Sequence, residues 1–499
     1  MGGFNLPSAS DPAVDALLNC YGVTLTWAEL NPAAGSYAFD ILAQLLDTVR
    51  GRNKCLVARL KHHVTDRVSP WGDDGVPYVP QWVLDVCQPP LFFTDVDGSN
   101  YIEVAAPWDG CLDGHYLTFV DALGATGHVA DPALGGLYIH GLSSSFGEEL
   151  WLDSAFIANA EAAGMTAENL YSTYDGRLTR WASVVGADVG KLAFVGAGWI
   201  SGYSDTMNAL DDRAMALGFG LRSGGFENYH SPMQSAVRGR DDWGLIYDET
   251  SRKITQIAGW PHRAVGRYLG GEDENFERGA AWELWLRATL FSESLVGANF
   301  VWLPGDEPTL ADNAAFLEWF SRTSSLPHAE RPDVVAWLRE DFVERPEDGA
   351  CLIVHNVELG LTQIDADQTV AAAMFDRSGM SGGSFTRDCD NNHFDYFARR
   401  SDVAAGADRF TFRIDDTFAA SLSGTVAIKV TFIDDTVTEW QLATEQGLAG
   451  VVTTDGGGAV RTATFELDAS ALDLSGGGRG FELQVTGAQD LTVRYVRVL

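Results

Sequence analysis

The chain has 499 residues with 69 acidic and 34 basic side chains, which gives a formal net charge of −35. At 46% hydrophobic residues and without blocks of like charge, it has the composition of a folded protein with an acidic surface. The charge disfavours nucleic acid as a partner. No apolar run approaches the roughly 20 residues of a membrane-spanning helix.

The first two thirds of the sequence alternate short apolar runs with helical patterns. The eight predicted strands are 21–27, 56–60, 102–106, 136–140, 192–196, 218–222, 263–269 and 299–303. The predicted helices are 39–50, 114–124, 205–217 and 279–295, with a hairpin insertion at 243–258. Strands joined by helices pair in parallel, and eight of them can close a barrel. The pattern therefore predicts an α/β fold, a (β/α)8 TIM barrel over residues 1–340.

The pattern changes towards the C-terminus, where apolar and alternating segments are separated by Gly and Asp turns with hardly a helix. Such a pattern is typical of antiparallel sheets packed face to face. We therefore expect an accessory β-sandwich domain over residues 341–499. Its exposed aromatic side chains are expected to be few, with Trp440 as the obvious candidate, so a packing role is as good an interpretation as glycan binding.

Two carboxylates follow glycine at the ends of predicted strands. Glu148 comes after the fourth strand, 136–140, and Glu272 comes after the seventh, 263–269. The carboxyl ends of barrel strands carry the active site in this fold class. Two facing carboxylates are what cleavage of a glycosidic bond requires, one to protonate the leaving oxygen and one to meet the developing oxocarbenium carbon. We predict Glu148 as the general acid/base and Glu272 as the nucleophile.

The position within each acidic cluster is left open, with Glu149 and Glu274 as the alternates. Each cluster also has an ordinary structural explanation. Glu148 and Glu149 could be an acidic pair that the dipole of a helix N-terminus favours, and residues 272–274 could form a solvated turn. Retaining enzymes hold the two carboxyl groups about 5 Å apart and inverting enzymes roughly 6.5–9.5 Å apart. A retaining mechanism is the favoured interpretation.

Further candidate substrate-binding residues lie at the same predicted ends of the strands. Aromatic rings can stack on sugar rings, and polar side chains can bind hydroxyl groups, although a single tryptophan is more often part of a core. The candidates are Trp27, Lys61, His62, Trp108, Asp109, His140, Trp199, Asn228, Tyr229 and Trp302.

The sequence gives little support for a metal or a cofactor. His62 and His63 are adjacent, and adjacent strand residues point to opposite faces, so they cannot both bind one ion without distortion. No nucleotide-binding glycine motif is present. Six cysteines occur without zinc spacing. Most are expected to be buried small side chains, with a Cys20–Cys55 disulfide as the alternative for that pair.

The N-terminal segment also resembles a known group of enzymes. Residues 22–37, with Trp27, Pro32, Gly35 and Tyr37, are similar to the opening of (β/α)8 glycoside hydrolases related to the β-galactosidase-like group. Segments such as 107–109 extend the similarity over roughly residues 21–305.

The resemblance implies roles for the two glutamates. In that group the fourth-strand glutamate is the acid/base and the seventh-strand glutamate is the nucleophile, which by position are Glu148 and Glu272. Many members have Asn before the acid/base, whereas Gly147 stands there in this chain. Segments 397–402 and 430–435 resemble the β-sandwich often appended to such barrels.

These observations predict a glycoside hydrolase that acts on an oligo- or polysaccharide without a cofactor. The alternative is a non-catalytic carbohydrate-binding protein on a barrel scaffold. The start of the chain lacks a signal peptide pattern. The expected location is secreted or cell-surface if such a peptide was removed, and otherwise cytoplasmic in a salt-adapted organism. The oligomeric state is not predicted.

Overall fold

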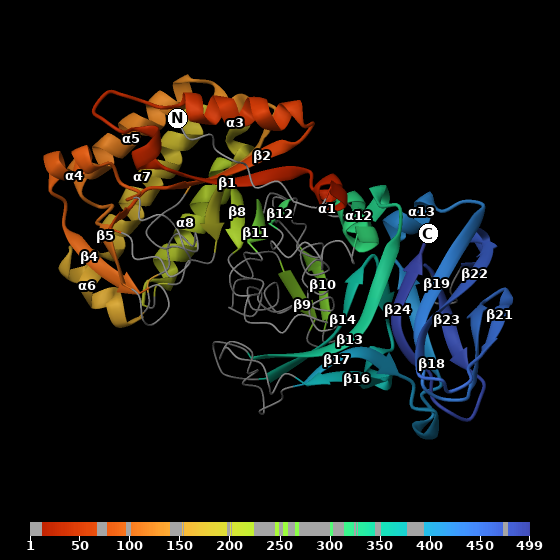
Figure 1. Cartoon of the computed structure of the whole chain (residues 1–499). Coiled ribbons are helices and arrows are strands. Elements are labelled where there is room, and N and C mark those ends of the chain that lie inside the picture. Colours follow the sequence, from red (N-terminus) through yellow and green to blue (C-terminus); the bar gives the residue numbers. More distant parts are fainter. Residues whose placement is uncertain are drawn as a thin grey trace. The chain divides into compact units, whose positions relative to one another are not determined.

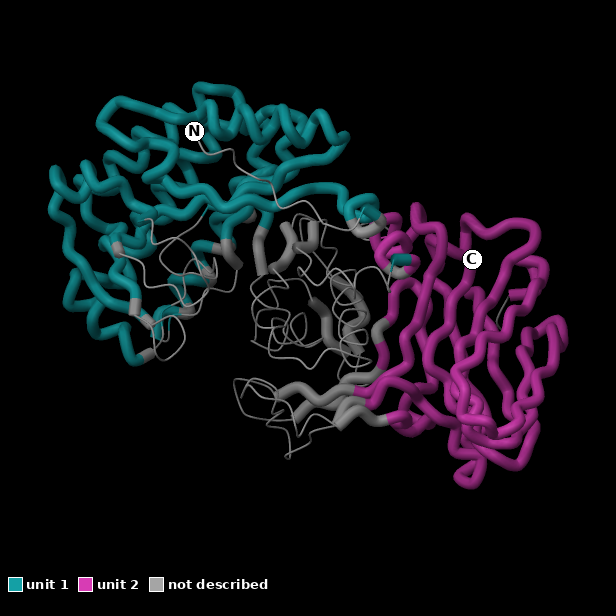
Figure 2. Tube along the Cα trace, viewed as in Figure 1, with its two compact units in different colours: residues 1–225, 261–271, 299–314 teal, residues 226–260, 272–298, 315–499 magenta. Residues whose placement is uncertain are grey.

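The computed structural model forms two compact units (Figure 2). Unit 1 consists of residues 1–225, 261–271 and 299–314, and unit 2 consists of residues 226–260, 272–298 and 315–499. The structure describes residues 12–66, 77–95, 101–139, 152, 154–196, 200, 202–223, 245–248, 253–257, 265–268, 300–302, 314–323, 326, 328–344, 351–376, 394–472 and 478–499.

Unit 1 is built around parallel strands. Five of them pair in parallel in chain order, namely β1 (Cys20–Thr26), β2 (Cys55–Lys61), β6 (Leu134–Ile139), β7 (Leu192–Gly196) and β8 (Gly220–Ser223). Next to β8 lies β11 (Val265–Tyr268), which pairs in parallel with β12 (Phe300–Trp302) (Figure 1). Among the described strands, no pairing joins β12 to β1, so the structure establishes the parallel strand series and not a closed barrel.

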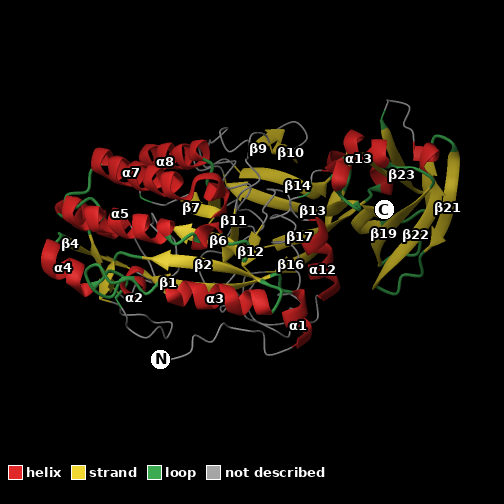
Figure 3. Ribbon diagram, turned by 90° about the horizontal axis from the view of Figure 1, so that it is seen from above, coloured by secondary structure: helices red, strands yellow, loops and turns green. Residues whose placement is uncertain are grey.

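Helices separate most of these strands along the chain (Figure 3). Helix α3 (Asp40–Gly51) buries Leu42, Leu45, Leu46 and Val49, a spacing of three or four residues that places them on one face. The predicted helices 39–50 and 205–217 correspond to α3 and to α8 (Ser204–Leu217).

Two long helices of unit 1 begin at side-chain caps. In α5 (Gly110–Ala125), the carboxylate of Asp109 accepts hydrogen bonds from the backbone nitrogens of Cys111 at 3.1 Å and Leu112 at 2.9 Å. Helix α7 (Ala167–Val185) starts at a capping box formed by Thr166 and Asn169. Helix α7 has no counterpart among the predicted helices, and α5 starts four residues earlier than expected because its cap is Asp109.

One predicted barrel strand is wrong. Residues 102–106 were expected as the third parallel strand, but β5 (Tyr101–Ala105) pairs antiparallel with β3 (Val64–Asp66) and β4 (Leu91–Asp95). Strands β4 and β5 are too close in sequence for the long crossover that parallel pairing requires. The strand at 136–140, expected as the fourth, is therefore the third of the parallel series. The hairpin predicted at 243–258 is confirmed by β9 (Leu245–Asp248) and β10 (Lys253–Ile257), which pair antiparallel.

The four cysteines described in unit 1 form two disulfides, Cys20–Cys55 and Cys87–Cys111. The expectation of buried free thiols is therefore wrong for them, and the disulfide alternative for Cys20 and Cys55 is the one found. These two residues are direct neighbours at the start of β1 and β2, with Cα atoms 4.2 Å apart. No described helix is long and apolar enough to cross a membrane.

Unit 2 contains two antiparallel sheets that share one core. The larger sheet consists of β13 (Val334–Glu344), β14 (Cys351–Leu359), β16 (Val370–Asp376), β17 (Phe394–Arg400), β19 (Thr425–Asp434), β22 (Ala459–Asp468) and β24 (Thr492–Val498). The smaller sheet consists of β15 (Leu361–Gln363), β18 (Arg409–Ile414), β20 (Glu439–Thr444), β21 (Gly447–Thr453) and β23 (Arg479–Val485). This β-sandwich-like region begins with β13, ahead of the predicted boundary at residue 341.

Alternation of buried and exposed side chains explains these sheets. Along β19 every second residue from Val426 to Asp434 is buried, so one face of the strand enters the core. Trp440, expected as an exposed aromatic, is 0% exposed and packs edge-on against Phe432 and Phe465. It is a core residue, and that expectation was wrong.

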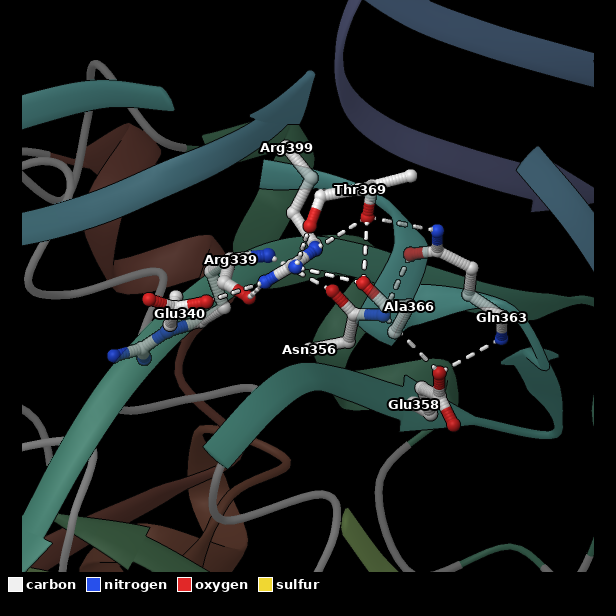
Figure 4. Close-up of polar contacts among 8 residues, drawn as sticks. All are labelled: Arg339, Glu340, Asn356, Glu358, Gln363, Ala366, Thr369 and Arg399. Carbon is white, nitrogen blue, oxygen red and sulfur yellow. Dashed lines mark hydrogen bonds and ion pairs between the residues drawn. The ribbon is translucent and has the colours of Figure 1, made fainter. Parts of the chain in front are cut away.

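A buried arginine links several segments of the larger sheet (Figure 4). Arg399 on β17 is 1% exposed. Its Nη2 donates to the carbonyl oxygens of Ala366 at 2.7 Å and Thr369 at 2.6 Å, and its Nε donates to Thr369 Oγ1 at 2.7 Å. Its Nη1 donates to Glu340 Oε2 on β13 at 2.9 Å. The guanidinium thus ties β17 to β13 and to the turn before β16.

The other described α-helices are short. They are α1 (Pro12–Leu17), α2 (Trp27–Leu30), α4 (Gln81–Cys87), α6 (Ile157–Ala162), α12 (Ala314–Thr323) and α13 (Asp416–Ser421).

Candidate functional site

The carboxyl ends of the parallel strands in unit 1 lie at one edge of the sheet. Thr26, the last residue of β1, pairs with Lys61, the last residue of β2, and Leu60 pairs with Ile139, the last residue of β6. In α/β sheets this edge is where ligands bind, because the loops that follow the strands meet there.

One face of β2 carries two buried cations towards this edge. Arg59 and Lys61 are two residues apart in a strand, so their side chains leave the same face as Val57. Val57 packs with Tyr138 and Ala193 of the next two strands. Arg59 is 8% exposed and Lys61 is 4% exposed. Charges removed from water require compensating charges or hydrogen-bond acceptors nearby.

Tyr78 lies beside Lys61. The Lys61 ammonium donates to the Tyr78 hydroxyl oxygen at 3.3 Å and lies 5.2 Å from the centre of the ring. The backbone of Tyr78 is itself held at the end of β1, since its carbonyl oxygen accepts a hydrogen bond from Ala28 N at 2.9 Å. The arrangement fixes a cation and a phenol at the carboxyl edge of β2.

The turn after β1 is rigid. Thr26 Oγ1 accepts a hydrogen bond from Glu29 N at 3.1 Å, and Thr26 N donates to Glu29 Oε2 at 2.8 Å, which forms a capping box. Trp27 follows directly and is 0% exposed. It packs edge-on against Tyr116 of α5, with ring centres 5.5 Å apart. Trp27, predicted as a substrate-binding residue, is thus placed in the core between β1 and α5.

The two histidines after β2 face the helices and are buried. His62 is 2% exposed and stacks on Tyr116, with ring centres 4.5 Å apart. Burial, with the nearby Arg177 guanidinium, lowers the pKa of His62 well below its usual range. Burial lowers the pKa of His63 in the same way, and His62 and Arg177 add to the effect. Both imidazoles are therefore neutral near pH 7.

Arg177 of α7 organises this buried group. Its Nη1 contacts His63 Nε2 at 2.6 Å, and its Nε donates to Asp113 Oδ1 of α5 at 2.6 Å. Burial disfavours the charge of Arg177, but Asp113, Tyr174 and Tyr116 raise its pKa. Because the guanidinium can only donate, His63 Nε2 is the acceptor, and its lone pair is not available to a metal ion.

Two other predicted site residues have structural partners. Trp108 stacks on Phe92 with ring centres 5.7 Å apart, and its Nε1 donates to the carbonyl oxygen of Ala163 at 2.7 Å. Asp109 caps α5, as described above. Trp108 therefore has a role in packing and Asp109 a role in helix capping. Lys61 differs from both, because its side chain leaves β2 on the face where Val57 packs with Tyr138.

The remaining predicted residues are only partly covered. Trp302 ends β12, and its backbone alone is described. The residues outside the described part of the chain are Glu148, Glu149, Glu272, Glu274, His140, Trp199, Asn228 and Tyr229.

Sequence reasoning missed four residues of this region. Arg59 could have been found, because it lies two positions before Lys61 and shares its face. Tyr78, Tyr116 and Arg177 gave no local signal. They reach β2 from loops and helices, and Arg177 is 114 positions after His63.

Neither a known family model nor a curated protein matches the sequence. Among solved structures, the catalytic domain of β-amylase from Paenibacillus polymyxa is similar, with 11% identity over 63% of this chain and 93% of that chain and a TM-score of 0.38. An exo-β-1,4-mannosidase from Opitutaceae bacterium strain TAV5 has 13% identity over 62% of this chain and 55% of that chain, with a TM-score of 0.35.

A smaller part of the chain is similar to a carbohydrate-binding domain. This is the CBM36-1 domain of a multidomain xylanase from the hindgut metagenome of Trinervitermes trinervoides, with 16% identity over 26% of this chain and 95% of that chain and a TM-score of 0.15. All three TM-scores are below 0.5, so these similarities do not establish a family, and the function is inferred from the chain's own residues.

Proposed function

We propose that the chain is a glycoside hydrolase that cleaves a glycosidic bond in an oligo- or polysaccharide. The observation that carries the proposal is the order of the strands. Glu148 comes soon after β6, which ends at Ile139, and Glu272 comes soon after β11, which ends at Tyr268. Both glutamates follow members of one series of neighbouring strands in unit 1, and loops after parallel strands are where such folds keep catalytic groups.

In the proposed mechanism Glu148 is the acid/base and Glu272 is the nucleophile. Glu148 protonates the leaving oxygen while Glu272 attacks the anomeric carbon and forms a glycosyl-enzyme intermediate. Glu148, now ionised, then takes a proton from the water that releases the sugar. The favoured outcome is retention of configuration, for which the carboxyl groups are about 5–5.5 Å apart.

Donors on β2 support a saccharide as the substrate. The Lys61 ammonium and the Tyr78 hydroxyl lie together at the carboxyl edge of β2, the strand next to β6. Hydroxyl oxygens of a sugar can accept hydrogen bonds from such groups.

The test is turnover of a glycan panel by single variants. Glu148→Gln is expected to lower turnover about 10²–10⁴-fold, the usual contribution of an acid/base, and Glu272→Gln is expected to lower it by at least about 10²-fold, because no covalent intermediate can form. Glu149→Gln and Glu274→Gln are the matched controls, since each lies in the same acidic cluster and is expected to retain activity. Azide should restore turnover to Glu272→Ala, because it can replace the missing nucleophile.

Three results would count against the proposal. Full activity in both Glu148→Gln and Glu272→Gln would refute the assigned roles. Loss of activity in the Glu149 or Glu274 variant instead would move the role to that alternate. Saccharide binding by the wild type without any product from the panel would favour a non-catalytic carbohydrate-binding protein.

A further inference from the structure

Three metal-binding side chains meet where α4 ends and α5 begins. Cys111 and His115 are four residues apart on α5, so they lie on one face of the helix. Cys87 is the last residue of α4. The sulfur atoms of Cys87 and Cys111 and a ring nitrogen of His115 all lie within 4.8 Å of one another. The ring of His115 also packs edge-on against Trp82 of α4, with centres 5.0 Å apart.

We propose that Cys87, Cys111 and His115 form a Zn²⁺ site that is available when the Cys87–Cys111 disulfide is reduced. Thiolate and imidazole ligands are those that zinc prefers, with Zn–S near 2.3 Å and Zn–N near 2.0–2.1 Å. In a tetrahedral site these bond lengths place the ligand atoms roughly 3.5–3.8 Å apart. The observed cluster is compact enough to reach that spacing by side-chain rotation.

The chemical step is balanced by a dithiol reductant. The reductant transfers two electrons and two protons to the disulfide, becomes a disulfide itself and leaves two thiols. Zn²⁺ then replaces the two thiol protons, which are released to solvent, and takes a lone pair from the neutral His115 ring. Three protein ligands leave the fourth tetrahedral position for water.

The backbone around the site supports both states. The Cα atoms of Cys87 and Cys111 are 5.5 Å apart. Asp109 holds the start of α5 through hydrogen bonds to Cys111 N and Leu112 N, and these do not depend on the disulfide. The N-terminal turn of a helix also favours a negatively charged thiolate. Cys111 is exposed and Cys87 and His115 are half-buried, so reductant and ion can reach them.

The experiment compares zinc binding by the oxidised and the reduced full-length protein. The protein is reduced with a dithiol, the dithiol is removed without oxygen, and Zn²⁺ alone is titrated against a competing chelator. The reduced protein is expected to bind one more equivalent of Zn²⁺ than the oxidised protein. Co²⁺ serves as the spectroscopic probe, because thiolate ligands give it a charge-transfer band.

Variants separate this site from the other cysteines. His115→Ala keeps the disulfide, and an unchanged melting temperature of its oxidised form shows that it folds. In its reduced form this variant is expected to bind Zn²⁺ more than about 100-fold more weakly. Removing a residue that only hydrogen-bonds to a metal ligand already lowers affinity about 10–100-fold, and removing the ligand itself should lower it further. His128→Ala, which changes a half-buried histidine outside the cluster, is the matched control and should keep wild-type affinity.

The proposal is overturned by any of three results. These are reduced protein that takes up no additional Zn²⁺, oxidised protein that binds it equally well, and reduced His115→Ala with wild-type affinity. The thiolate band of Co²⁺ should also vanish in the double variant Cys87→Ser/Cys111→Ser, which removes both thiolates, and persist in Cys20→Ser, which removes the other disulfide. A band that persists in the double variant and vanishes in Cys20→Ser would assign the ion to Cys20 and Cys55 and reject the proposed site.

Discussion

Replacing Arg399 by methionine should destabilise unit 2 strongly. Methionine retains much of the apolar stem but removes the guanidinium that donates to Ala366, Thr369 and Glu340. A buried acceptor left without a donor costs about 1–3 kcal/mol, and breaking a buried ion pair costs about 3–5 kcal/mol. Because the Glu340 side chain is 16% exposed, water can compensate part of its loss. We therefore expect a total near 3–4 kcal/mol, at the lower end of that range.

The assay is urea unfolding of the full-length protein, with hydrogen exchange of peptides from β13 and β17 to assign the transition to unit 2. Arg400→Met is the matched control, since it changes the next residue in the same strand. The Arg400 side chain is 44% exposed and lies 3.8 Å from Asp490 Oδ2, so its loss should cost less than about 1 kcal/mol. Arg399→Lys should fall between the two, because one ammonium cannot reach all the acceptors that the guanidinium spans.

The outcome that would refute this reasoning is equal stability of Arg399→Met and Arg400→Met. It would mean that the hydrogen bonds drawn in Figure 4 contribute no more than an exposed ion pair does. A loss confined to peptides of unit 1 would contradict it as well.

Three further predictions concern unit 1. Because burial holds the pKa values of His62 and His63 below the ordinary 6.5, the unfolded chain takes up protons below that pH that the folded unit does not. The free energy of unfolding should keep its highest value above pH 6.5, and below that pH it should fall by at most about 1.4 kcal/mol per pH unit for each histidine. Urea unfolding measured from pH 7 to 5 should show a shallower dependence of this free energy on pH for His62→Gln than for the wild type. Lys61→Met should lower turnover of the glycan substrate more than about 100-fold, which is the usual effect of removing one donor that stabilises a transition state. A melting temperature that falls together with activity would instead indicate a structural role for Lys61. Thr166→Ala should cost about 1 kcal/mol by removing the cap of α7, and it should shift the pH profile without changing its slope, so a changed slope would count against the histidine explanation.

The local pattern of the sequence was enough to predict many elements. Helix α3 and the hairpin of β9 and β10 follow from apolar spacing and turn residues, because a period of 3.6 or 2 is a property of neighbouring residues. The same reasoning predicted that antiparallel sheets dominate the C-terminal part of the chain. It also gave Lys61 at the end of β2, since a strand and its last residue are read from one short segment.

Which segments meet was decided by the tertiary structure. The apolar run in β5 looked like a barrel strand, but its short connection to β4 led it into an antiparallel sheet. Trp27 and His62 followed strand ends as expected, yet the packing of α5 buried both. The proximity of Cys87 to Cys111 and His115 of α5 was also not predicted, because Cys87 is 24 residues from Cys111 in the sequence. Periodicity fixes the face that an element buries, whereas its partner depends on crossovers and on packing between residues far apart in sequence.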